Sequence, residues 1–186
     1  MFGNARNRRM IRPTPSEGCV SNWLSRTVRT LLLLIIFLPI SAQVGDREPA
    51  PRFNAKTTAG GKYTNDSLKG RVVLLQFWTT WCPYCRREQS VVDSLDKEFR
   101  DQGLVVLAVD VNESKKTVKK YLEQNPRSCR IVLTEDTNLA AMYAANSYPI
   151  YVVIDREGNV VGTQRGAAGE RGLRSMLNRA GLSASE

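Results

Sequence analysis

Continuous apolar runs in the body of the chain predict strands that are buried on both faces of a sheet. The two clearest are Val72–Phe77 and Leu104–Val109, because a strand covered on one face only would alternate apolar and polar residues. Shorter runs predict further strands at Arg130–Leu133, Ile150–Ile154 and Val160–Thr163. A Gly-containing turn of hairpin length separates the last two, so we expect them to pair in antiparallel fashion.

Apolar residues at helical spacing predict helices between these strands. One helix follows Pro83, one spans Lys115–Gln124, a short one covers Asn138–Ala145, and a last one with an apolar stripe ends the domain. Strands Phe53–Thr57 and Lys62–Thr64 flank a Gly-Gly pair and predict an N-terminal hairpin. Buried strands that alternate with helices indicate a parallel core with helices on both faces, to which the hairpins add antiparallel strands. The predicted fold is an α/β three-layer sandwich with a mixed sheet.

Composition agrees with one globular domain plus additional segments. The 186 residues are 42% hydrophobic and 24% charged, which excludes a disordered chain or a fibre. The formal net charge of +9 is uneven, because residues 1–30 carry six arginines and a single acidic residue. The remainder has no basic stripe with interleaved aromatic residues, so nucleic acid is not an expected partner. We divide the chain into a leader over residues 1–44, a domain over residues 45–182 and a tail over residues 183–186.

The leader combines a basic region with a short apolar segment. Arg26 and Arg29 precede the apolar run Leu31–Ile40, and small residues around Ala42 follow it, an order typical of a secretory signal. Ten helical residues span about 15 Å, roughly half of a membrane's hydrocarbon core, so we expect cleavage near Ala42. An uncleaved membrane anchor over residues 28–44 is the alternative. Both interpretations place the domain outside the cytoplasm.

Cys82 and Cys85 lie where the first buried strand ends and a helix begins. A helix N-terminus stabilises a thiolate through its free N–H groups and its dipole, and Pro83 fits the first helical turn. We expect Cys82 to be exposed, acidic and the attacking nucleophile. We expect Cys85, one turn further, to be more buried and to resolve the mixed disulfide. The chain has no histidine, which excludes Cys-His and His-ligated metal chemistry.

Other uses of this cysteine pair fit the sequence less well. A zinc site needs four ligands, and neither a second CxxC nor a histidine pair is present. A copper(I) chaperone would use the same thiolates, but four methionines and no histidine leave few further ligands. An inert structural disulfide and a redox-inactive binding module are the remaining alternatives. We expect no cofactor and no metal.

Residues 77–88, Phe-Trp-Thr-Thr-Trp-Cys-Pro-Tyr-Cys-Arg-Arg-Glu, resemble the active-site segment of extracytoplasmic thioredoxin-like thiol–disulfide oxidoreductases of the TlpA/ResA/DsbE type. The resemblance covers about residues 47–182 and includes residues 48–53, the Tyr148-Pro149 pair and residues 154–158. It implies a thioredoxin-like fold with an added N-terminal hairpin. The Pro-Tyr pair between the cysteines departs from this family and is common in glutaredoxins.

The resemblance also implies roles for individual residues. Pro149 is expected to form a cis peptide that faces the cysteines and presents the backbone of Tyr148 to an incoming chain. Thioredoxin itself carries a buried Asp where this chain has Gln76. Glu88, on the same helix face as Cys85, is therefore the candidate proton acceptor, with a surface carboxylate as the alternative interpretation. The predicted substrate-binding residues are Trp81, Pro83, Tyr84, Tyr148 and Pro149.

The activity implied by the resemblance is reduction of protein disulfides by the Cys82/Cys85 dithiol. Cytochrome c maturation or related thiol repair is the expected task, with electrons from a membrane-bound donor, in the periplasm or on the outer face of the cytoplasmic membrane. No charged residue separates the cysteines, and Thr134–Ser147 is too short for the helical domain that strong oxidants often insert. We therefore expect a reductant of moderate potential. A disulfide-forming oxidant or isomerase is the alternative.

Three further residues carry open expectations. Arg86 and Arg87 follow the motif and either lower the pKa of the thiols or are solvated charges on a helix face. Cys129 is the third cysteine of the domain. We expect it to be a small buried hydrophobe, with a third redox cysteine or an intermolecular bridge as the alternatives.

Overall fold

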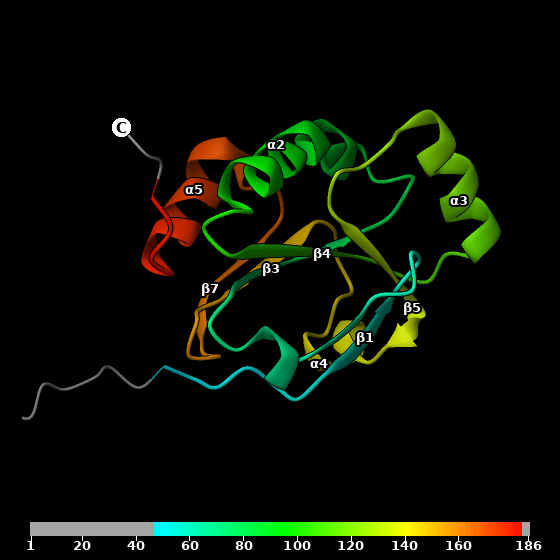
Figure 1. The fold of residues 1–186 in the computed structure, drawn as a ribbon. Coiled ribbons are helices and arrows are strands. Elements are labelled where there is room, and N and C mark those ends of the chain that lie inside the picture. The colour runs from blue at the N-terminus through cyan, green and yellow to red at the C-terminus, as the bar shows by residue number, and fades with distance from the viewer. Residues whose placement is uncertain (1–46, 184–186) are drawn as a thin grey trace, which may run out of the picture. The chain divides into compact units, whose positions relative to one another are not determined.

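The computed structural model describes residues 47–183, so the predictions for the leader lie outside the described residues. The strands are β1 (Asn54–Thr57), β2 (Lys62–Thr64), β3 (Val72–Trp78), β4 (Leu104–Asp110), β5 (Arg130–Thr137), β6 (Ile150–Ile154) and β7 (Val160–Arg165). The helices are η2 (Asp66–Leu68, a 3₁₀ turn), α2 (Pro83–Phe99), α3 (Lys115–Gln124), α4 (Leu139–Met142) and α5 (Gly169–Arg179) (Figure 1). None of the helices in the described range combines the length and apolar character needed to cross a membrane.

All of these strands join one mixed sheet with the order β2-β1-β5-β4-β3-β6-β7. β3 pairs with β4 in parallel and with β6 in antiparallel fashion, and every residue of β3 is buried. The predicted N-terminal hairpin and the closing hairpin are confirmed as β1–β2 and β6–β7. The continuous apolar run of β3 therefore marks a central strand, as its pattern predicts.

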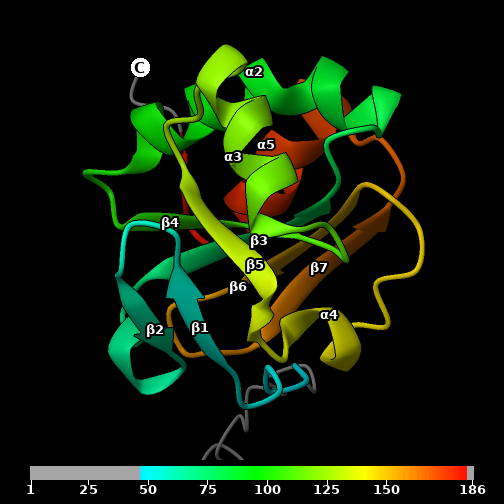
Figure 2. The same ribbon diagram turned by 90° about the vertical axis from the view of Figure 1, so that its right-hand side faces the viewer.

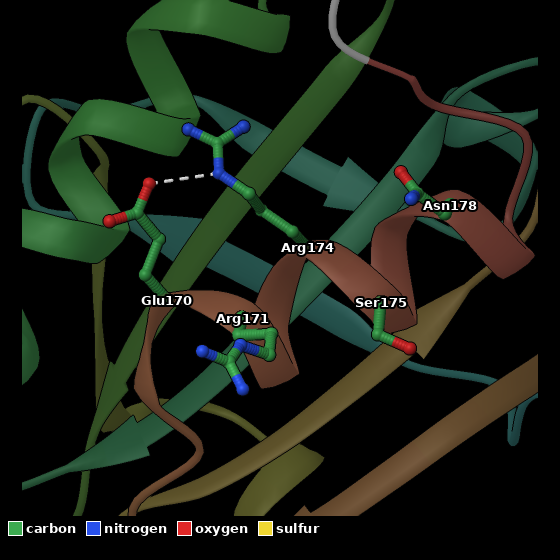
Figure 3. A pocket seen from close by; sticks show the side chains of 5 residues that line it. All are labelled: Glu170, Arg171, Arg174, Ser175 and Asn178. Atoms are coloured by element: carbon green, nitrogen blue, oxygen red, sulfur yellow. Dashed lines mark hydrogen bonds and ion pairs between the residues drawn. The ribbon is translucent and has the colours of Figure 1, made fainter.

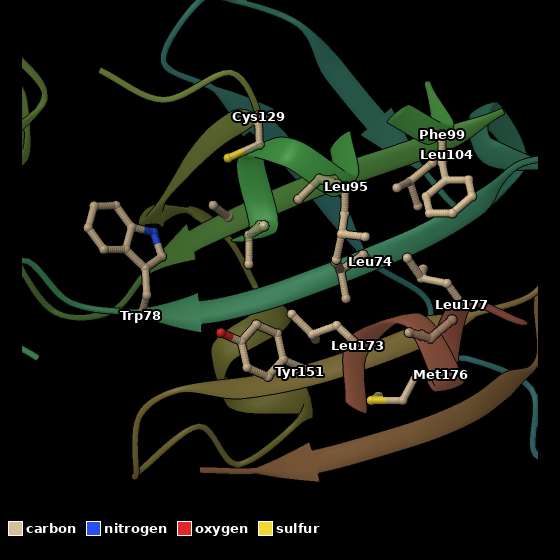
Figure 4. Packing of buried hydrophobic residues seen from close by; sticks show 14 of the residues in the cluster. Leu74, Trp78, Leu95, Phe99, Leu104, Cys129, Tyr151, Leu173, Met176 and Leu177 are labelled. Atoms are coloured by element: carbon tan, nitrogen blue, oxygen red, sulfur yellow. The ribbon is translucent and has the colours of Figure 1, made fainter. Parts of the chain in front are cut away.

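Strand alternation divides the interior into two apolar cores. On one face of the sheet, residues such as Leu74 and Trp78 of β3 pack beneath α2, α3 and α5, and Figure 4 shows Leu74 close to Leu95 of α2 and to side chains of α5. On the other face, residues such as Leu75 and Phe77 pack against α4, η2 and the segment before β1. Helices were expected on both faces. The second face carries only short ones, because the extended N-terminal segment covers much of it.

The helix α2 is held on the sheet by its apolar side. Val92, Leu95 and Phe99 are at most 1% exposed and recur at the spacing of one helix face. Full burial of such a side chain contributes about 1.5–3 kcal/mol to folding. This packing fixes the N-terminal end of α2 at the carboxyl end of β3, where the two cysteines lie.

Two elements differ in length from the sequence prediction. β5 continues to Thr137 rather than ending at Leu133, because its second half pairs with β1. α4 is shorter than the expected Asn138–Ala145, since Ala144 takes a left-handed backbone conformation with φ 45° that a helix cannot contain. The helix Lys115–Gln124 agrees with its prediction at both ends.

Candidate active site

The two cysteines occupy the junction between β3 and α2. Cys82 is the N-cap of α2, with extended backbone angles, and its Sγ accepts a hydrogen bond of 3.1 Å from the backbone N–H of Cys85. Pro83 follows at the first helical position, where the missing N–H costs no hydrogen bond. The sulfur of Cys82 thus lies at the positive end of the helix dipole, which favours a thiolate.

Cys82 and Cys85 form a disulfide, with Cα atoms 5.3 Å apart, within the usual range for such bonds. Both residues are only 2% exposed. The prediction that Cys82 would be exposed is therefore wrong for the oxidised protein. The disulfide turns the Cys82 sulfur toward Cys85, and the same sulfur accepts a hydrogen bond from the backbone N–H of Cys85.

Exposed aromatic side chains surround the disulfide. Trp81 is 63% exposed and Tyr84 52% exposed, and Pro83 is also exposed. The Trp81 ring meets the Tyr148 ring edge-on, with centroids 5.9 Å apart. The predicted cis peptide is confirmed at Tyr148–Pro149. The structure therefore brings the loop before β6 next to the cysteine motif, although the two are more than 60 residues apart in sequence.

Glu88 is buried beneath the first turns of α2, at 7% exposure. Its Oε2 accepts a hydrogen bond of 2.8 Å from the hydroxyl of Tyr151 on β6. Its Oε1 accepts another from the backbone N–H of Gly169, the first residue of α5. The alternative of a surface carboxylate is therefore wrong. Glu88 instead links α2, β6 and the N-terminus of α5, one helical turn after Cys85.

The hydrogen bonds of Glu88 continue into the protein. Gln76 Nε2 donates to the Tyr151 hydroxyl at 3.3 Å, and Gln76 Oε1 accepts from the Arg127 guanidinium at 3.0 Å. Arg127, 1% exposed, pairs in turn with both carboxylate oxygens of Asp93 at 3.0 Å. Burial, together with the hydrogen bond to Glu88, raises the pKa of Tyr151 well above its ordinary value. We call Gln76, Glu88, Asp93, Arg127 and Tyr151 the buried polar network.

A second buried acid lies at the carboxyl end of β4, the parallel neighbour of β3. Asp110 ends β4 directly beside Trp78 of β3. It is fully buried, and neither carboxylate oxygen has a hydrogen-bond partner among the described residues. Burial, and then the neighbouring carboxylate of Glu113, raise the pKa of Asp110 to about 8. Glu113 itself accepts hydrogen bonds from the backbone and hydroxyl of Thr80, just before the motif.

The remaining predicted residues have plainer roles. Arg86 donates to the Thr80 carbonyl at 2.7 Å and lies over the Tyr121 ring, and the Arg87 guanidinium lies over the Tyr84 ring. Cys129 is free and 7% exposed, and burial raises its pKa to about 12. The expectation of a small buried hydrophobe at Cys129 is confirmed.

Sequence reasoning missed Tyr151, Arg127, Asp93 and Asp110. A tyrosine within the apolar run of β6 was a usable signal, since a buried tyrosine hydroxyl needs a partner. Asp110 was a usable signal as well, because it ends a buried strand and the carboxyl ends of neighbouring parallel strands lie side by side, where sites are commonly found. Arg127 lies in the loop before β5 and donates a hydrogen bond to Gln76, 51 positions earlier in the sequence. No local sequence pattern predicts this contact.

The larger hollows described on the protein are lined by neither Cys82 nor Cys85. One of about 580 Å³ runs along α5 and is lined by Glu170, Arg171, Arg174, Ser175 and Asn178 (Figure 3). Arg174 there is already paired with Glu170 and Glu98. In the part of the chain that the structure describes, no three potential metal ligands lie together.

A disulfide-forming CxxC at the start of a helix, beside a cis-proline loop on a mixed sheet, defines a thiol–disulfide oxidoreductase of the thioredoxin fold. The AhpC/TSA family matches residues 47–163, and the chain belongs to this family. The thiol-disulfide oxidoreductase ResA of Bacillus subtilis is 28% identical over 162 residues, which cover 81% of this chain and 90% of that protein. The predicted fold and enzyme class are thereby confirmed.

Solved structures agree with this assignment. A thiol:disulfide interchange protein of the thioredoxin family from Chlorobium tepidum superposes with a TM-score of 0.64 and 26% identity, covering 73% of this chain and 97% of that one. An exposed lipoprotein thioredoxin from Streptococcus pneumoniae superposes with a TM-score of 0.60 and 26% identity, covering 69% of this chain and 99% of that one.

Proposed function

We propose that this protein reduces the disulfides of other proteins outside the cytoplasm, using Cys82 as nucleophile and Cys85 as resolving thiol. The observation that carries this proposal is the position of the pair: Cys82 caps the helix, while Cys85 lies one turn inside it. The thiolate is the reactive form, and the cap position stabilises it more than the interior position does. The exposed Trp81, Pro83 and Tyr84 and the half-buried Tyr148 then offer a surface to the substrate, while Pro149 itself is buried behind it and would act through the backbone of Tyr148.

The reaction consists of two exchanges. The Cys82 thiolate attacks one sulfur of the substrate disulfide, and the substrate's S–S bond breaks as its second sulfur leaves as a thiolate. The Cys85 thiol then loses its proton and attacks the Cys82 sulfur, which releases the first substrate sulfur as a thiolate. The substrate gains two electrons, and the enzyme ends with the Cys82–Cys85 disulfide that this structure contains.

We assign the acceptance of the Cys85 proton to Glu88. It is buried one turn after Cys85, and Tyr151 and Gly169 fix both of its oxygens. Gln76 occupies the position at which thioredoxin itself has a buried Asp. Its amide cannot accept a proton as a carboxylate does. Tyr151 and Gln76 are positioning residues for Glu88, because they act through their hydrogen bonds to it and not on sulfur.

Two features support the reducing direction. A strong oxidant needs a thiolate pKa near about 3.5, which requires added stabilisation between the cysteines, whereas Pro83 and Tyr84 carry no charge. The segment between β5 and β6 holds only the four-residue helix α4. The Pro83-Tyr84 pair, common in glutaredoxins, favours an intermediate potential of about −200 to −230 mV. Cytochrome c maturation or related thiol repair, with a membrane-bound electron donor, is the task we propose.

Export is proposed on the sequence of residues 1–44, with the domain beginning at residue 45 and the last residues, 183–186, as a tail. The leader is either cleaved near Ala42 or retained as an anchor over residues 28–44. A reporter enzyme that is active only outside the cytoplasm, fused after residue 60, tests this directly. Activity of a cytoplasm-only reporter at the same position would contradict export.

Three measurements test the redox proposal. Equilibration of the cysteine pair against glutathione buffers gives its potential, and a value near about −120 mV would make disulfide formation the task instead. The variant Cys85→Ser should trap substrates as mixed disulfides on Cys82, which identifies them. Glu88→Gln should slow resolution and alter the thiol titration while the fold is kept, and an unchanged titration would remove Glu88 from the mechanism.

A further inference from the structure

Helix α3 carries a set of charges that its own structure does not explain. Lys115, Lys116, Lys119 and Lys120 are all exposed, and none of them forms an ion pair with any residue in the range 47–183. They make three like-charge pairs at neighbouring helix positions (115/119, 116/120 and 116/119), which destabilise a helix, and the only acid of α3 is Glu123. Two of them stand in the first turn, without an acidic residue there, where the helix dipole disfavours cations. Helix α3 thus keeps an excess of positive charge that disfavours its own structure, and such unfavourable local arrangements are expected mainly at functional sites.

A groove lies beside these lysines. It has a volume of about 490 Å³ and runs between α3, β5 and the turn after β1, which Figure 2 shows as α3 lying in front of β5 with the β1–β2 hairpin to one side. The exposed Lys115 and Lys119 border it together with one exposed acid, Glu123. Its buried or half-buried apolar lining comes from Val118, Leu122 and Leu133. We call this hollow the α3 groove.

The α3 groove continues into a second hollow. That hollow, of about 380 Å³, shares Thr58 and Leu122 with the first and adds the apolar side chains of Pro126 and Ile131. Its cations are engaged, since Arg127 pairs with Asp93, and Arg130 bonds to Tyr63 and lies near Asp96. The excess positive charge, four lysines against Glu123, therefore lies on the α3 side.

We propose that the α3 groove binds an acidic segment of a partner protein, with apolar side chains of that segment on the groove lining and its carboxylates at the lysines. Burial of apolar side chains supplies affinity, and the charge complementarity supplies orientation and a faster encounter. The protein's own leader does not fit this description, because six arginines and one acid in residues 1–30 would repel the lysines.

One end of the α3 groove, at Lys115, is two residues away from a contact with the cysteine loop. Glu113, two residues before Lys115, accepts a hydrogen bond of 2.6 Å from the hydroxyl of Thr80, which stands two residues before Cys82. A partner held by α3 is thus delivered beside the cysteine motif. The inference rests on the thiol–disulfide exchange of this family and holds for either direction of electron flow.

Binding of a short, cysteine-free peptide of alternating Glu and Leu to the oxidised full chain tests the proposal. We expect amide signals of Thr58, Leu122 and Leu133 to shift in nuclear magnetic resonance spectra. Affinity should fall about tenfold or more between 10 mM and 1 M salt, as the screening length shortens from about 30 Å to about 3 Å. Because the probe has no cysteine, failure to bind would refute this inference without touching the redox proposal.

Two double variants make the test specific. Lys115→Glu/Lys119→Glu should weaken peptide binding about tenfold. The change at Lys115 places an acid in the first turn of α3, where the helix dipole favours it, and a circular dichroism spectrum of the variant checks that the fold is kept. The matched control Lys69→Glu/Lys97→Glu makes the same change in net charge at exposed sites outside the groove and should keep the affinity of the parent protein. Equal weakening in both variants would overturn the proposal.

Two further outcomes would also overturn it. Equal affinity for a peptide of alternating Gln and Leu would show that the lysines take no part. Stronger binding to phosphatidylglycerol vesicles than to the peptide, lost in Lys115→Glu/Lys119→Glu, would assign the lysines to a lipid surface instead of a protein segment.

Discussion

The two faces of the central sheet share their strands but differ in chemistry. On the face covered by α2 and α5, the strands β3, β4 and β6 each bury one polar residue: Gln76, Asp110 and Tyr151. On the opposite face, the same three strands present only Val, Leu, Ile and Phe. Successive side chains of a strand point to opposite faces. The same strands therefore supply an entirely apolar face, and a second face, here called the polar face, that also carries buried polar groups.

The polar face is costly to build. A buried polar group without a partner loses about 1–3 kcal/mol, so the members of the buried polar network must satisfy one another. They do so across four separate segments: β3, α2, the loop before β5, and β6. The opposite face needs no such matching. Substitutions on the polar face should therefore affect both stability and disulfide exchange, whereas substitutions on the opposite face should affect stability alone.

The largest effect is expected at the cysteines. Cys82→Ala should abolish exchange with protein disulfides, because no thiolate remains to attack, whereas Cys85→Ala should keep the first attack and accumulate mixed disulfides. Alkylation of the reduced protein at low pH, followed by mass mapping, reports which thiol is the more acidic. Labelling of Cys85 before Cys82 would reverse their assigned roles.

A matched pair of neighbours on β3 separates the two faces. Leu74 and Leu75 are both fully buried, the first under α2 and the second on the opposite face. Each change to Ala should lower the free energy of unfolding by about 2–5 kcal/mol. Leu75→Ala should leave the rate of insulin reduction by the folded protein unchanged, whereas Leu74→Ala should reduce it through looser packing of α2.

Chemical denaturation and rate measurements on the same samples give both quantities. Equal slowing of insulin reduction by Leu74→Ala and Leu75→Ala would show that the faces are not functionally distinct.

Asp110 gives the polar face a dependence on pH. Its pKa of about 8 in the folded protein compares with about 3.9 for an unfolded aspartate. Between these values the folded state keeps a proton that the unfolded state has lost, so stability falls as pH rises from about 4 to about 8. Asp110→Asn removes this loss and should gain stability over the parent protein across that range, at about 1.4 kcal/mol per unit of pKa difference.

Denaturation midpoints at pH 4, 6 and 8 measure the effect of Asp110→Asn. The exposed acid Glu135 provides the control: Glu135→Gln should run parallel to the parent protein at each pH. A parallel course for Asp110→Asn as well would refute a buried protonated carboxyl at this position.

The sequence predicted the scaffold more completely than the site. Val72–Phe77 differs from the observed β3 by one residue, because a continuous apolar run has a single favourable place in such a sheet. The cysteine pair was also found from sequence, since its spacing and its helix start carry the chemistry. The exposure of Cys82 was predicted wrongly, and Arg127 was missed. The burial of Cys82 follows from its disulfide with Cys85. The contact of Arg127 with Gln76 depends on how distant segments meet, which neither periodicity nor spacing encodes.

The smallest difference is expected between two tyrosines that share chemistry but not surroundings. The hydroxyl of Tyr151 joins Gln76 and Glu88 on the polar face. The hydroxyl of Tyr143, packed against the opposite core, is buried without a partner among the described residues. Tyr151→Phe should lower the free energy of unfolding by about 1–3 kcal/mol, and Tyr143→Phe should leave it unchanged or raise it, because no hydrogen bond is lost there.

Function should divide the two tyrosines in the same way. Tyr151→Phe removes one of the two groups that fix Glu88, so the step in which Cys85 attacks the mixed disulfide should slow and its pH profile should move. Tyr143→Phe should leave both unchanged, since Tyr143 contacts Phe77 on the opposite face. Single-turnover measurements with a preformed mixed disulfide on Cys82 follow this step alone. If Tyr151→Phe destabilises the fold but leaves that step and its pH profile unchanged, the hydrogen bond from Tyr151 to Glu88 has a structural role only and does not contribute to the exchange reaction.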